Sequence, residues 1–291
     1  MVKVNEVRED DQVREAVKTV LKGAAPERVS DIEGLWAQLV LRLQFTNDTY
    51  NNRRVIMRAG MFNVVQFNHR TLRLFWVAGY AAWEAYQLAI ESVVNDQPPS
   101  YTKLHELVNC YTEVLSSPDP VNVALPNYVP QPGTFAADPI VRAPGEIATI
   151  AVAWAFLHEV MHIQHEQADP TADRINRTPE DRWKEELSCD AFAARFLLEK
   201  HNEYKNGLNE SSDRVQMKRE LGVYFGLFAL TLMSKDHWGN SDTHPAMRKR
   251  IDNVRAQFGS SFSKEAVLIA GFSFNTLKRI WPNAPTFSDF S

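Results

Sequence analysis

The chain has 291 residues but only two cysteines, Cys110 and Cys189. Small secreted folds that depend on disulfides are rich in cysteine, so this low count favours a reducing compartment. The first residues, 1–11, are polar and charged and lack the apolar core of a secretory signal. We therefore expect a cytoplasmic protein.

The chain also lacks a strong excess of either charge, with 32 basic residues, 36 acidic residues and a net charge of −4. Such a balance creates no large positive field for nucleic acid or for an anionic membrane surface. The uncharged apolar runs fall short of the roughly 18–20 residues that cross a bilayer. We expect neither a nucleic-acid partner nor a membrane span.

Proline concentrates in residues 116–145, which hold seven of the 15 prolines. Proline excludes helix over most of this stretch, and the alternating residues 121–125 predict one strand within it. We therefore divide the chain into a helical N-terminal region, residues 1–115, a Pro-rich connector or edge strand, residues 116–145, and a C-terminal region, residues 146–291. The three could also form one continuous domain.

Most of the remaining chain carries apolar residues at helical spacing. Residues 55–67 are mixed, and their pattern allows either a hairpin that turns near Ala59-Gly60 or a broken helix. The expected fold class is mainly α with a small β element (α+β). The predicted helices cover residues 11–22, 32–43, 71–94, 101–115, 148–166, 182–200, 213–234, 245–258 and 264–280.

One motif organises the C-terminal region, His158-Glu159-Val160-Met161-His162. It lies in residues 148–166, which contain no glycine or proline and predict a buried helix. Side chains at i and i+4 lie about 40° apart on one helix face, so His158 and His162 can bind one metal ion. Glu159 can then take a proton from water and pass it to a leaving amine. The motif predicts a metallopeptidase with one Zn²⁺ per chain and a protein or peptide substrate.

The next predicted helix supplies candidates for the third metal ligand. Glu186 and Asp190 share one face of it, at i and i+4. A catalytic zinc with two His ligands often takes a carboxylate as its third, and a ligand histidine usually donates its other N–H to a further carboxylate. We expect Glu186 to bind the metal and Asp190 to orient a histidine, with Glu185 as the alternative ligand. The metzincin pattern is excluded because His165 and Ala168 replace its Gly and final His.

The HExxH motif followed by Glu186-x-x-x-Asp190 resembles the gluzincin group of zinc peptidases. In that group a Glu completes the metal site, and an Asp four residues later binds a ligand histidine. Thr243-His244-Pro245 with Arg250-Ile251 resembles a segment of the HtpX-type peptidases, in which the His faces the developing oxyanion. Residues 186–198 are similar to the corresponding helix of the ImmA/IrrE-type peptidases.

Chain length, cytosolic character and a helical N-terminal half most resemble the Lit-type phage-exclusion peptidases. The resemblance implies a gluzincin-like catalytic core in residues 146–291, an intracellular protein substrate, and a regulatory or phage-defence role. It also implies that His244 assists the oxyanion, as a rigidly held His-Pro could, with His237 and Tyr224 as rivals.

Two further expectations concern how such an activity is used. A cytosolic peptidase must be restrained, so we expect the Pro-rich stretch or a regulatory partner to cover the cleft. The alternative function is a non-catalytic regulator or interaction protein with a structural or vestigial metal site.

Overall fold

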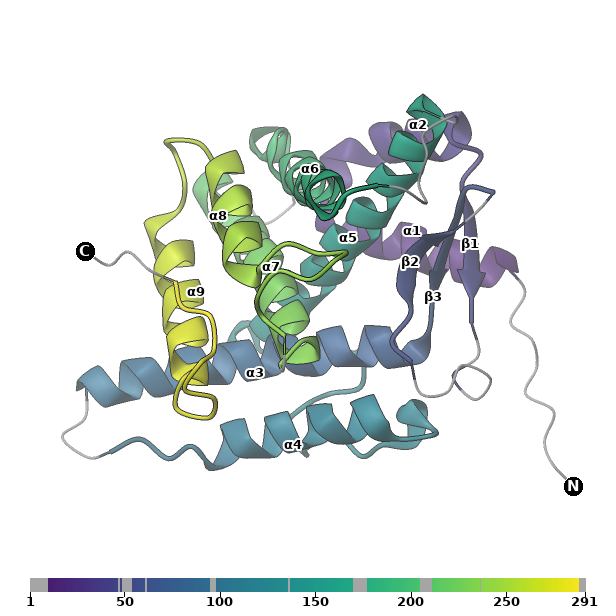
Figure 1. The fold of residues 1–291 in the computed structure, drawn as a ribbon. Coiled ribbons are helices and arrows are strands. Elements are labelled where there is room, and N and C mark those ends of the chain that lie inside the picture. The colour runs from purple at the N-terminus through teal and green to yellow at the C-terminus, as the bar shows by residue number, and fades with distance from the viewer. Residues whose placement is uncertain are drawn as a thin grey trace, which may run out of the picture.

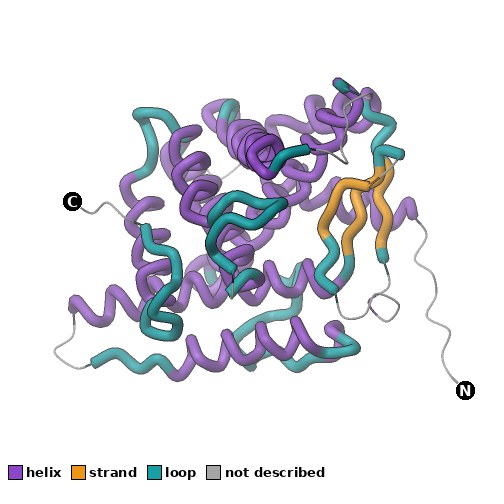
Figure 2. Tube along the Cα trace, viewed as in Figure 1, coloured by secondary structure: helices purple, strands orange, loops and turns teal. Residues whose placement is uncertain are grey.

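The computed structural model describes residues 10–46, 48, 54–60, 62–94, 98–135, 137–169, 177–204, 211–235 and 237–287. Of the residues that the structure describes, 67% are helical, and four-residue strands form a three-stranded sheet, so the expected fold class is confirmed. Figure 2 shows the strands beside the helices. The helices are α1 (Asp10–Ala24), α2 (Val29–Gln38), α3 (His69–Val94), α4 (Thr102–Ser116), α5 (Pro139–Ala168), α6 (Pro179–Leu198), α7 (Ser212–Met233), α8 (Met247–Gln257) and α9 (Lys264–Leu277). The strands are β1 (Arg42–Phe45), β2 (Met57–Gly60) and β3 (Val64–Phe67).

Helix α5 runs through the middle of the molecule and carries the HExxH motif (Figure 1). It packs against α3, α6 and α7, and against α1 and strand β2 on another side. Helices from both sides of the Pro-rich stretch therefore share one hydrophobic core with α5. The motif lies where the surrounding elements can bring further side chains to it.

Part of α5, Val141–Ala168, is long and apolar enough to span a membrane by length and composition alone. It is the one such helix in the part of the chain that the structure describes. Within its most apolar window, 78% of the residues are buried inside the protein, as in a core helix. The sequence prediction considered only the shorter uncharged run in this helix, because charged residues flank it.

Helix α7 approaches α5 closely at two glycines. A Cβ added at Gly222 would lie 2.2 Å from Cγ2 and 2.5 Å from Cβ of Ile150. A Cβ added at Gly226 would lie 2.5 Å from the ring of Trp154. Because Trp154 precedes His158 by one helical turn, these glycines set the distance between α7 and the motif-bearing part of α5.

The sheet has the strand order β1-β3-β2. Strand β1 pairs with β3 in parallel, and β2 pairs with β3 in antiparallel orientation, with Met57 opposite Phe67. A hairpin within residues 55–67 is thus confirmed, although it turns at Phe62 and Asn63 rather than near Ala59-Gly60. Strand β2 lies at the edge of the sheet and against α5.

Three sequence predictions near these elements are wrong. The helix predicted over residues 32–43 ends at Gln38, and β1 begins at Arg42, where exposed and buried residues alternate as they do in a strand. The strand predicted over residues 121–125 is absent. A 3₁₀ helix, Pro120–Asn122, starts there instead, and the Arg73 guanidinium binds the Val123 carbonyl at 2.6 Å. The helix predicted to start at residue 148 starts at Pro139, inside the Pro-rich stretch, because proline is tolerated in a first turn, and it also contains Pro144.

We expect Gly222→Ala to lower the free energy of unfolding by ~1–3 kcal/mol, because the methyl group must displace Ile150 next to its backbone. The gain in helix propensity, about 1 kcal/mol at most, does not offset this cost. Gly34→Ala in α2 is the matched control, since its added Cβ would meet nothing within 4 Å. Urea unfolding curves measure both variants. A Gly222→Ala midpoint equal to that of the wild type would contradict the close approach of α5 and α7.

Candidate active site

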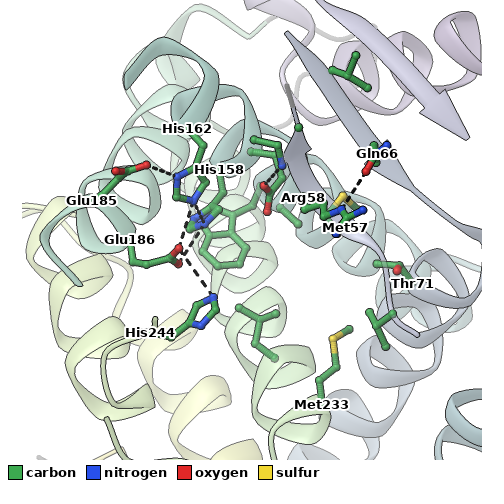
Figure 3. A pocket seen from close by; sticks show the side chains of 18 of the residues that line it. Met57, Arg58, Gln66, Thr71, His158, His162, Glu185, Glu186, Met233 and His244 are labelled. Atoms are coloured by element: carbon green, nitrogen blue, oxygen red, sulfur yellow. Dashed lines mark hydrogen bonds and ion pairs between the residues drawn. The ribbon is translucent and has the colours of Figure 1, made fainter. Parts of the chain in front are cut away.

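His158 and His162 project from one face of α5 toward a common point (Figure 3). Their Nε2 atoms lie 3.2 Å apart. His158 is buried and His162 is half-buried. The helix thus brings the two histidines together as their spacing predicts, with the same ring nitrogen of each directed inward.

Glu186 of α6 faces both imidazoles (Figure 3). Its Oε2 lies 3.4 Å from Nε2 of His158, and its Oε1 lies 3.3 Å from Nε2 of His162. The residue is 9% exposed, and Oε2 has no hydrogen-bond partner within the described chain. An unsatisfied buried carboxylate oxygen is costly. Ligands bound at 2.0–2.1 Å to one tetrahedral ion lie about 3.3 Å apart, so the three side chains fit a divalent metal.

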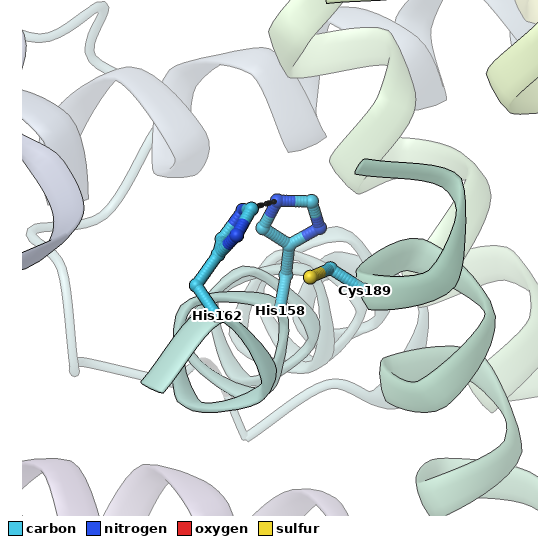
Figure 4. Close-up of side chains that lie close together, drawn as sticks. All are labelled: His158, His162 and Cys189. Atoms are coloured by element: carbon cyan, nitrogen blue, oxygen red, sulfur yellow. Dashed lines mark hydrogen bonds between the residues drawn. The ribbon is translucent and has the colours of Figure 1, made fainter. Parts of the chain in front are cut away.

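Cys189 also lies close to the two histidines (Figure 4). Its Sγ and one ring nitrogen from each histidine lie within 4.8 Å of one another. Sequence reasoning did not assign Cys189 to the site, although its position three residues after Glu186 places it on the same helix face. Burial raises the pKa of its thiol to about 11. Glu186 is the stronger candidate for the third ligand, because its two carboxylate oxygens face the Nε2 atoms of both histidines.

The outer nitrogen of His158 binds a buried ion pair. Its Nδ1 lies 2.9 Å from Oδ1 of Asp190, which is fully buried. Arg250 of α8 donates to both oxygens of this carboxylate, from Nη2 to Oδ1 at 2.6 Å and from Nε to Oδ2 at 2.8 Å. Asp190 therefore lies where it can orient His158. In the sequence, Arg250 is part of the resemblance to HtpX-type peptidases, but no role for it was predicted.

The outer nitrogen of His162 binds a second carboxylate. Nδ1 of His162 lies 2.8 Å from Oε1 of Glu185, and Glu185 forms an ion pair with Arg177 just before α6. Glu185 therefore contacts the ring nitrogen opposite to the one that Glu186 faces. This geometry favours Glu186 over Glu185 as a metal ligand and makes Glu185 the partner that orients His162.

The carboxylates around the two imidazoles favour positive charge between them. Burial disfavours the charged form of His158, but its contacts with Asp190 and Glu186 outweigh burial and raise its pKa to about 9. Neighbouring side chains likewise outweigh burial at His162 and raise its pKa. Burial also opposes the ionisation of Glu186, yet the two histidines hold the pKa of its carboxyl well below the usual value. A cation at this point meets an environment that already favours positive charge.

Glu159 points from α5 toward the edge strand β2. Its Oε2 accepts a hydrogen bond of 2.6 Å from the backbone N–H of Ala59. Burial raises the pKa of the Glu159 carboxyl, which suits a group that must exchange a proton. The contact with Ala59 is a feature that sequence reasoning could not supply, because the two residues are 100 positions apart.

His244 reaches the site from the connection between α7 and α8 (Figure 3). Its Nε2 lies 3.8 Å from Oε1 of Glu186, and its Nδ1 lies 2.7 Å from the Thr243 hydroxyl. Partial burial lowers the pKa of the His244 imidazole. Of its two rivals, His237 is not among the residues that line the cleft, and Tyr224 is fully buried in the core.

The site opens into a cleft with a volume of about 940 Å³. One wall is formed by β2 and β3, including Arg58 and Gln66, and Phe75, Trp154 and Met233 supply apolar lining. No described residue of the Pro-rich stretch lines the cleft, so the expectation that this stretch covers it is wrong. The stretch packs on α3 instead, where Nε1 of Trp76 donates to the Pro130 carbonyl at 2.8 Å.

One protein-family model matches most of the chain. The family model for peptidase U49 matches residues 65–272, which include the predicted catalytic and metal-binding residues His158, Glu159, His162, Glu186, Asp190 and His244. The chain belongs to the peptidase U49 family. This is the Lit-type family, so the resemblance to Lit-type peptidases is confirmed. The similarities to gluzincins, to HtpX-type and to ImmA/IrrE-type peptidases stay predictions. No curated protein and no solved structure matched the chain.

We expect Arg250→Ala to lower the free energy of unfolding by ~3–5 kcal/mol, because it leaves the Asp190 carboxylate buried without its guanidinium partner. Arg248→Ala on the same helix is the matched control. Arg248 pairs with the exposed Asp252 and donates one hydrogen bond of 2.8 Å to the Thr286 carbonyl, so its loss should cost less, about 1–2 kcal/mol. Denaturant unfolding measures both. Adding Asp190→Asn to Arg250→Ala should recover part of the loss, and no recovery would mean that Arg250 acts through packing alone.

Proposed function

We propose that this member of the peptidase U49 family is a zinc-dependent endopeptidase that hydrolyses peptide bonds in an intracellular protein substrate. The observation that supports zinc is the convergence of His158, His162 and Glu186, with inward nitrogens and oxygens 3.2–3.4 Å apart and one buried carboxylate oxygen without a hydrogen bond. These three side chains would hold the ion. Asp190 and Glu185 would orient the two histidines from outside.

Bound zinc would supply Lewis-acid activation of water and of the scissile carbonyl. Glu159 adjoins His158 and would take the proton of the attacking water as general base, then give it to the leaving amine as general acid. Glu186 lies between His244 and the two histidines of α5 (Figure 3). His244 would donate a hydrogen bond to the developing oxyanion. Its lowered pKa keeps the ring neutral at neutral pH. A Thr243 hydroxyl that donates to Nδ1 would leave the ring proton on Nε2, which faces the site.

Strand β2 is the element best placed to bind an extended substrate. The Asn68 N–H donates to the Ile56 carbonyl, and hydrogen-bonded pairs in an antiparallel ladder occur at every second residue. Arg58 and Gly60 are therefore the residues bonded to β3, and the backbone groups of Met57 and Ala59 face away from the sheet. The Ala59 N–H reaches Glu159 from this side. A substrate added along β2 as a further strand would lie across the catalytic residues.

We also infer the biological setting from the Lit-type family. A cytoplasmic location, a regulatory or phage-defence role, and a partner that restrains or activates the enzyme are consistent with it. The small negative net charge, −4, supports the proposal that neither nucleic acid nor a membrane is a partner.

Metal content of the untagged protein, measured by mass spectrometry, tests the ligand set. We expect about one zinc per chain in the wild type and in Glu159→Gln, and loss of zinc in His158→Ala and in Glu186→Ala. Zinc that persists in Glu186→Ala would move the third ligand to Cys189. Absence of metal from the wild type after zinc loading would refute zinc dependence. Hydrolysis of a peptide library completes the test, because Glu159→Gln should keep zinc and lose at least about 100-fold in rate. Equal rates would favour a structural metal site.

The contact between Glu185 and His162 predicts a separate effect on metal affinity. We expect Glu185→Ala to weaken zinc binding by ~10–100-fold, because His162 loses the partner that fixes its ring orientation. Glu185→Gln keeps a hydrogen-bond acceptor and should retain most of the affinity. Glu180→Ala, at an exposed position in the first turn of α6, is the control. Competition with a zinc chelator gives the dissociation constants. An affinity of Glu185→Ala equal to that of the control would remove Glu185 from the site.

A further inference from the structure

Three non-glycine residues have positive φ among those that the structure describes, and all three lie at one end of the sheet. The φ angles are 48° at Val40, 65° at Phe62 and 58° at Asn63. Val40 precedes β1, whereas Phe62 and Asn63 form the turn between β2 and β3. The two turns are adjacent, because the Arg42 N–H donates to the Asn63 carbonyl at 2.8 Å.

Two of these three residues are poorly suited to the conformation they adopt. Asn tolerates positive φ because its short polar side chain can bond locally, but a β-branched or bulky residue there is an outlier. Turns with positive φ strongly favour Asn, Asp and Gly. Packing within the chain does not explain why apolar residues occupy these two positions, since Val40 is 64% exposed and Phe62 is 77% exposed. Strained residues that carry exposed apolar side chains indicate a functional constraint.

The position of the turn indicates what these side chains meet. Phe62 lines the cleft together with Gly60 and Val64. A polypeptide that runs along β2 from Met57 past Gly60 would reach Phe62 next. At about 3.3 Å per residue, Phe62 lies roughly three residues beyond Ala59, which contacts Glu159. Phe62 is therefore part of the cleft wall, and Val40, which does not line the cleft, lies on the adjacent turn.

We propose that Val40 and Phe62 form an apolar tip that binds an apolar side chain of the substrate, about three to four residues from the cleaved bond. The occupant is the polypeptide substrate itself, because Phe62 lines the cleft and Val40 lies on the turn next to it. This inference rests on the proposed peptidase function and adds to it a preference at a position distant from the cut. It also implies that the cleavage rate of short peptides does not depend on Val40 and Phe62, since such peptides do not reach the tip.

Substitution by asparagine separates binding from folding. Phe62→Asn and Val40→Asn remove the apolar side chain and place a residue that tolerates positive φ. We expect the thermal midpoint to stay unchanged or to rise by ~2 °C. Cleavage of long peptides with an apolar residue at the distant position should slow by ~10-fold, and cleavage of short peptides should not change. Val94→Asn is the control, because Val94 is equally exposed, at 73%, but lies at the end of α3 and outside the cleft.

The assay uses a proteome-derived peptide library, with products sequenced to give the preference at each position. An unchanged preference in both tip variants would overturn the proposal while leaving the peptidase function in place. A lower midpoint with equal slowing of short and long peptides would also overturn it, because the tip would then be structural. A change of oligomeric state in Phe62→Asn, followed by size-exclusion chromatography, would assign the tip to contact between copies and not to substrate.

A binding measurement separates failure of the tip from failure of the peptidase function. Immobilised Glu159→Gln protein is incubated with the same library, and the retained peptides are sequenced. Retention of apolar peptides that is lost in Glu159→Gln/Phe62→Asn would support the tip even if the wild type cleaves nothing. Retention that is identical with and without Phe62 would refute the tip whatever the activity of the wild type.

Discussion

The bidentate contact between Arg250 and Asp190 is the interaction on which the candidate site depends. It joins α8 to α6 deep in the protein, and Asp190 extends it to His158 on α5. Two charges removed from water stabilise each other only when their hydrogen bonds are nearly complete, and here the guanidinium and the imidazole occupy both carboxylate oxygens. The position of His158 is thus fixed by the packing of the consecutive helices α5 and α6 with α8, which is distant from them in the sequence.

The second histidine is held by a different and more exposed arrangement. Glu185 contacts Nδ1 of His162 and pairs with Arg177, as Asp190 contacts Nδ1 of His158 and pairs with Arg250. Glu185 and Arg177 are both half-buried. Exposure weakens such a pair, because water competes for the same charges. The two sides of the site therefore differ in how far they are shielded from water. One histidine is set in the core, and the other is set beside the segment that precedes α6.

Local periodicity was sufficient to predict the central part of the site. The i, i+4 relation places His158 beside His162, and Glu186 beside Asp190, within single helices, and the structure brings these pairs together. The fold class followed from the same periodicity. Periodicity could not show that Ala59 meets Glu159 or that Arg250 meets Asp190, because those contacts depend on how distant elements pack. The short strand β1 was read as the end of a helix because four residues give too weak an alternation to be recognised.

Helix α6 places Glu185, Glu186, Cys189 and Asp190 within six consecutive residues around the two histidines. All four side chains share one helical register, so their directions cannot be adjusted separately. One residue inserted between Glu186 and Asp190 would rotate Asp190 by about 100° relative to Glu186 and separate it from both His158 and Arg250. Length changes before residue 177 leave these angles intact. Descendants of this sequence can therefore vary the length of the connection ahead of α6, while within the helix they are restricted to substitutions.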